Sequence, residues 1–76
     1  MMDKNYMELI KQASGDAWIL FKAYIGIKNN DDAEWDKFLA DANKICEKYK
    51  GTKAEEYTRR YIVDVVITEV ERVSKL

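Results

Sequence analysis

The stretch Tyr61–Ile67, which reads YIVDVVI, decides between two fold classes for this chain. Its β-branched residues and its apolar odd positions are typical of a strand. The alternation fails at Glu69, however, and no other part of the chain reads as a partner strand. Upstream, Glu55 and Glu56 are each followed four residues later by an arginine, an order that stabilises helices. We therefore predict a helix over about residues 53–74.

Two further helices precede this one, and each ends at a glycine. Apolar residues at steps of three and four mark one face over about residues 4–25, where Gly26 supplies the stop. A second and narrower apolar stripe predicts a helix over about residues 32–50, which Gly51 ends. Short connections of this kind join antiparallel neighbours.

Capping motifs support both later helix starts. Asp31 and Thr52 are each followed three residues later by a glutamate, which is the form of a capping box. We predict an all-α fold, an up-down-up three-helix bundle with helices over about 4–25, 32–50 and 53–74. The 76 residues fit a single helical domain that covers residues 1–76.

The composition excludes most catalytic and metal chemistry. The chain has no histidine and one cysteine, which removes histidine-based triads, the usual zinc sites and an intramolecular disulfide. Its three glycines are isolated, so no phosphate-binding loop is formed. Cys46 falls within the apolar stripe of the second helix, where we expect a core residue. We expect no enzyme activity, no catalytic or metal-binding residues and no cofactor.

The expected location is the cytoplasm. No apolar run reaches the roughly 18 residues that a membrane span needs. The N-terminus does not have the form of a signal peptide, and a lone cysteine fits a reducing compartment. We therefore expect no membrane association.

The width of the apolar arcs points to a binding partner. At about 100° per residue, the apolar arc of the second helix spans roughly 120°, whereas that of the third spans roughly 240°. In this rotation Tyr61, Val65 and Val66 face the core, and an excess apolar surface is left over. Such surfaces usually mark an interaction site, although scattered half-exposed apolar residues are also common. The predicted interface residues lie on the first and third helices: Trp18, Ile25, Val63, Ile67 and Val70.

The leading hypothesis is therefore a small non-enzymatic helical module that forms a homodimer or binds another protein. An alternative is nucleic-acid binding through basic residues near the second turn, which are interleaved with tyrosines. The basic residues of this alternative are Lys48, Lys50, Lys53, Arg59 and Arg60. Against the alternative, the 13 basic and 14 acidic side chains nearly cancel, and lysines at a helix end are ordinary.

Overall fold

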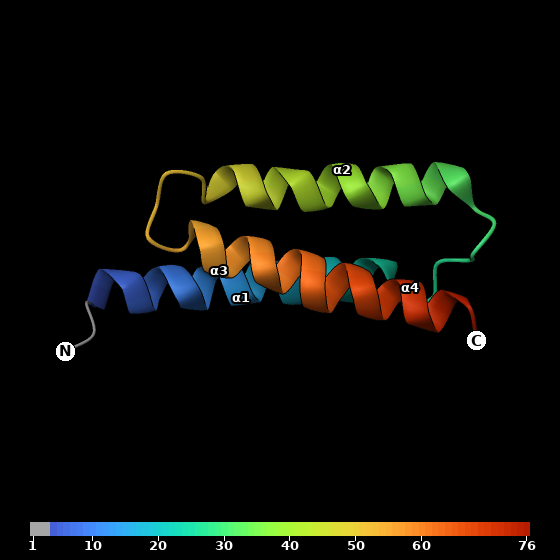
Figure 1. Cartoon of the computed structure of the whole chain (residues 1–76), viewed down its shortest axis with the longest axis horizontal. Helices are drawn as coiled ribbons and strands as arrows, with labels where there is room; N and C mark the ends of the chain where they lie inside the picture. Colours follow the sequence, from blue (N-terminus) through green and yellow to red (C-terminus); the bar gives the residue numbers. More distant parts are fainter. Residues whose placement is uncertain (1–3) are drawn as a thin grey trace.

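The computed structural model describes residues 4–76, all of whose regular elements are helical. In order these are α1 (Lys4–Tyr24), α2 (Asp32–Lys48), α3 (Glu55–Arg60), η1 (Tyr61–Ile67) and α4 (Thr68–Ser74). The last three follow one another without a break, and we call residues 55–74 the C-terminal helix. The predicted all-α three-helix fold is confirmed. Figure 1 shows the chain reversing at both connections, so α1 and the C-terminal helix run in one direction and α2 in the other.

The helix ends follow the predicted stop and cap residues closely. Gly26 and Gly51 have φ angles of +98° and +80°, a left-handed conformation that glycine adopts without strain. Asp31 caps α2, because its side chain accepts a hydrogen bond of 3.1 Å from the backbone N–H of Glu34. α2 ends at Lys48, two residues before the predicted end.

The second capping motif works differently from the prediction. Thr52 accepts from the N–H of Ala54 at 3.1 Å, and Glu55 accepts from the N–H of Gly51 at 2.9 Å. Both side chains therefore stabilise the turn between the helices rather than the first helical turn. As a result the C-terminal helix begins at Glu55 and not at residue 53.

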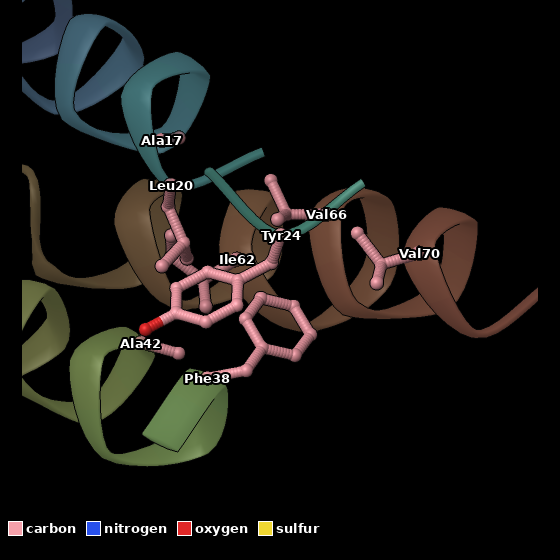
Figure 2. Packing of buried hydrophobic residues seen from close by; sticks show 8 residues of the cluster. All are labelled: Ala17, Leu20, Tyr24, Phe38, Ala42, Ile62, Val66 and Val70. Carbon is pink, nitrogen blue, oxygen red and sulfur yellow. The ribbon is translucent and has the colours of Figure 1, made fainter. Parts of the chain in front are cut away.

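The main core lies where the three helices meet. The rings of Tyr24 from α1 and Phe38 from α2 pack with their centroids 4.9 Å apart. Figure 2 shows Ile62 and Val66 of the C-terminal helix beside these two rings. A smaller cluster at the other end joins Ala13, Tyr49 and Ala54. The buried members of the main cluster are Ala17, Leu20, Tyr24, Phe38, Ala42, Ile62, Val66 and Val70.

The segment η1 is a π-helix, whose turns take up more residues than those of an α-helix. The hydroxyl of Thr68 reaches back five residues and donates to the carbonyl of Val63 at 3.0 Å. The buried residues of the C-terminal helix are spaced four apart: Thr58, Ile62, Val66 and Val70. In an α-helix, residues at this spacing drift by about 40° at each step. The wider turn reduces the drift, so the row keeps facing the core.

The π-helix corrects the predicted rotation of the C-terminal helix. Val70 was expected on the outer ridge but is completely buried, with 0% of its surface exposed. Val65 was expected in the core but is 53% exposed. Ile67, also predicted for the outer ridge, is half-buried and packs against the main core cluster. The rotation was wrong because it assumed an α-helical turn throughout.

A candidate docking groove between α1 and the π-helix

An open groove runs between α1 and η1 on the surface of the bundle. Its volume is about 360 Å³. Trp18 and Val65 stand at its two sides, and each is 53% exposed. Its lining residues are Trp18, Phe21, Tyr61, Asp64, Val65, Val66, Thr68 and Glu69. The groove therefore exposes large apolar side chains from two helices at one place.

Aromatic contacts fix the α1 side of the groove. The rings of Trp18 and Phe21 stack with a centroid distance of 5.7 Å and an interplanar angle of 14°. The Nζ of Lys22 lies 5.7 Å from the centroid of the Trp18 ring, a cation–π distance. The indole is thus held in a set orientation although half of it is exposed.

Tyrosines fix the side that the C-terminal helix contributes. The hydroxyls of Ser14 and Tyr57 are 2.7 Å apart and form a hydrogen bond between α1 and α3. One turn further on, the ring of Tyr61 packs on that of Tyr57, with the ring centroids 5.8 Å apart. Because Val65 follows Tyr61 at the same four-residue spacing, the wide turn of η1 brings it onto the same side of the helix.

The two sides of the groove carry opposite charges. Lys22 is the charged residue beside Trp18 on α1, whereas Asp64 and Glu69 line the opposite side. Glu69 accepts a hydrogen bond of 2.9 Å from Arg72 of its own helix. Within residues 4–76, no side chain forms an ion pair with Asp64. The groove is therefore apolar in the middle, with the positive Lys22 on the α1 side and the negative Asp64 on the η1 side, while Glu69 of α4 is paired with Arg72.

The structure brings only part of the predicted interface together. Trp18 lines the groove, and Ile25 lies further along α1 with 37% of its surface exposed. Val63 is 47% exposed but lines a different hollow, together with Arg59 and Arg60. Ile67 and Val70 belong to the core side of the helix, as described above. The five predicted residues therefore do not form one continuous face.

Trp18 is the one lining residue that was predicted for the interface, and the partly exposed apolar residues missed from the sequence are Phe21, Tyr61 and Val65. Phe21 lies within the apolar face predicted over residues 4–25, which was expected to be buried. Tyr61 and Val65 were assigned to the core because α-helical geometry was assumed. The available signal was the repeat of Tyr57, Tyr61 and Val65 at steps of four, alongside the buried row at the same spacing.

Three of the five basic residues of the alternative hypothesis have carboxylate partners within the bundle. Lys48 pairs with Asp16 of α1 at 2.8 Å. Arg59 and Arg60 both pair with Glu56, at 2.7 and 3.3 Å. Nucleic-acid binding depends on cations that are available to phosphates, and these three have carboxylate partners instead.

A second groove, of about 380 Å³, lies between α1 and α2, but its polar groups bind one another. The hydroxyl of Tyr24 donates to Asp41 at 2.5 Å, and this bond helps to raise the pKa of Tyr24 to about 12. Asp16 accepts from Lys48 and from the hydroxyl of Tyr49, at 2.8 and 2.7 Å. These contacts connect α1 to α2 and use the hydroxyl and carboxylate groups of the groove internally, so that Lys44 is the lining side chain without such a contact among residues 4–76.

Cys46 packs against the main core cluster, as its place in the apolar stripe predicted. The thiol is half-buried, and this burial raises its pKa above the ordinary value. A raised pKa reduces the fraction of thiolate, which is the reactive form. The residue therefore behaves as part of the packing rather than as a nucleophile.

Over residues 4–76, no helix has both the length and the apolar character that crossing a membrane requires.

Comparison of the chain with models of known families, with curated proteins and with solved structures finds no match.

Proposed function

We propose that this chain is a small non-enzymatic module of the cytoplasm that binds a protein surface through the apolar groove between α1 and the C-terminal helix. The observation that carries the proposal is the half-exposed Trp18, held in a fixed orientation at the side of that groove. Tryptophan is enriched among the residues that dominate binding energy at protein interfaces. A rigid aromatic ring also loses little conformational entropy when a partner covers it.

The second side of the groove supports the same function. Val65 and Tyr61 lie opposite Trp18, so a partner that inserts an apolar side chain would contact two helices at once. The surrounding acidic and basic side chains resemble the polar rim that encloses the apolar centre of an interface. Protein binding therefore uses the features that the groove contains, whereas nucleic-acid binding would rely on five cations, three of which already have carboxylate partners.

Photo-crosslinking from within the groove tests this proposal. A photoreactive phenylalanine analogue replaces Trp18 in one variant and the exposed Ala40 of α2 in a control, and both are irradiated in cells. We expect protein cross-links from position 18, of whatever partner mass, and none from position 40. Because the analogue replaces Trp18 itself, a third variant carries it at Val65 on the other side of the groove. Equal cross-linking from groove and control positions, or no protein product from either groove position, would show that the groove does not dock a protein.

A further inference from the structure

We propose that the occupant of the groove is a second copy of this chain, related to the first by a two-fold axis that runs along the groove. This inference rests on the proposed function, since it names the partner that the groove binds. The observation that supports it is charge complementarity: the groove has the basic Lys22 on one side and the acidic Asp64 at the same level on the other.

Contacts between the helices fix how far along the bundle the charged residues of each side lie. The Ser14–Tyr57 hydrogen bond sets α1 against the C-terminal helix, and the two helices run in the same direction, as Figure 1 shows. One turn further along, Trp18 and Phe21 face Tyr61 and Val65 across the groove. Lys22, over the ring of Trp18, therefore lies at about the height of Asp64.

A two-fold axis along the groove converts this arrangement into a self-complementary surface. It places α1 of one copy on the C-terminal helix of the other, with both helices parallel. Lys22 then meets Asp64 of the second copy, and the same pair forms again on the other side of the axis. Trp18 meets Tyr61 and Val65 of the second copy between the two ion pairs. A two-fold axis across the groove would instead set α1 on α1 and the acidic side on itself.

The size of the face suits a dimer of standard dimensions. The molecule measures 45 × 20 × 16 Å, so the roughly 800 Å² that each partner buries in a stable interface requires a contact that extends beyond the groove along most of one long side. A two-fold dimer is also the commonest way in which a chain covers its own apolar surface.

Charge reversal at the two positions tests the arrangement as well as the stoichiometry. Sedimentation equilibrium is measured for the wild type, for Lys22→Glu, for Asp64→Lys and for the double variant. We expect a wild-type dimer at high micromolar concentration and dissociation about tenfold easier for each single variant, whose dimers hold two like-charged pairs. The double variant restores both attractive pairs and recovers the wild-type affinity. An equimolar mixture of the single variants does the same as a heterodimer.

The remaining outcomes distinguish this inference from the proposed function. Single variants whose effects simply add in the double variant would exclude the axis along the groove. A wild type that is monomeric at high micromolar concentration would exclude the second copy. In that case a cross-link from position 18 to a different protein keeps the proposed function, and the absence of any cross-link removes that as well. Circular dichroism of each variant shows that the helical fold is retained.

Discussion

α2 and the C-terminal helix contribute to the same core, but their inward-facing residues follow different spacings. In α2 and its C-cap residue these are three and four apart: Trp35, Phe38, Ala42, Ile45 and Tyr49. In the C-terminal helix the buried residues are spaced four apart throughout. Seven residues of this helix, Tyr61–Ile67, form a π-helix. A spacing that alternates between three and four matches an α-helix, whereas repeated steps of four suit a wider turn.

The difference shows what the π-helix adds to the molecule. It keeps the buried row straight, and it places a second row at the same spacing, ending in Tyr61 and Val65, along the side that faces Trp18. The regular helix α2 buries one stripe and contributes nothing to this groove. π-helical turns within α-helices are often found at functional sites, and here the wide turn forms one wall of the candidate docking groove.

Single-residue deletions test this comparison with the largest expected effects. Deletion of exposed Asn43 from α2 shortens the step from Ala42 to Ile45 and rotates every later residue by about 100°. The lost packing then removes most of the free energy of unfolding, which is roughly 4–11 kcal/mol for a domain of this size. We expect this variant to be unfolded by circular dichroism.

The matched deletion in η1 removes Asp64, which is also exposed. It changes the spacing of Thr58, Ile62, Val66 and Val70 from three steps of four to four, three and four, which is an α-helical spacing. We expect this variant to fold with an uninterrupted α-helix and to lose no more than about 2 kcal/mol in urea denaturation. Unfolding of both deletion variants would show that the π-helix is not one inserted residue in an otherwise α-helical pattern.

A pair of aspartate substitutions tests the rotation of the C-terminal helix. Val70→Asp places a carboxylate in the fully buried row, at a cost of roughly 3–5 kcal/mol in the free energy of unfolding. Val65→Asp changes a half-exposed side chain and costs less than about 1 kcal/mol. Chemical denaturation of the two variants measures both values. The opposite ranking would mean that the helix has the α-helical rotation after all.

These residues also show how much the sequence could predict. Fold class depends on where helices start and stop, and local chemistry at Asp31, Gly26 and Gly51 determines those positions. The candidate site depends on helix rotation, which a single change in turn width alters for every later residue. This is why the predicted burial of Val65 and the predicted exposure of Val70 were both wrong, while the predicted three-helix fold was correct. Lys48 and Asp16 pair with each other from different helices, so this contact could not be inferred from the spacing within one helix.

A prediction of intermediate size concerns how α2 and the C-terminal helix are each held on α1. Burial alone would raise the pKa of Asp16, but hydrogen bonds from Lys48 and Tyr49 outweigh it and lower the pKa below its ordinary value. The stabilisation by this carboxylate is therefore present at neutral pH and lost as the pH falls through its lowered pKa. We expect Asp16→Asn to cost about 1–2 kcal/mol at neutral pH and progressively less in acid.

Ser14→Ala is the matched control, because it removes the contact between α1 and the C-terminal helix instead. The Ser14–Tyr57 bond joins two neutral hydroxyls, so its loss costs about 1 kcal/mol at every pH below neutrality. Denaturation curves recorded between neutral pH and pH 3 compare the two variants. Parallel pH profiles would contradict the role given to the Asp16 carboxylate.

The smallest expected effect belongs to Thr68, whose hydroxyl bridges back five residues to the carbonyl of Val63. Thr68→Val keeps the shape and the helix propensity of the side chain but removes this bond. We expect the free energy of unfolding to fall by about 0.5–1 kcal/mol. Amide hydrogen exchange within Tyr61–Ile67 should become faster than in the wild type, while exchange in α2 stays at the wild-type rate. Thr68→Ser, which keeps the hydroxyl, should retain most of the protection. If Thr68→Val accelerates exchange equally in both helices, the bond supports global stability and has no particular part in holding the wide turn.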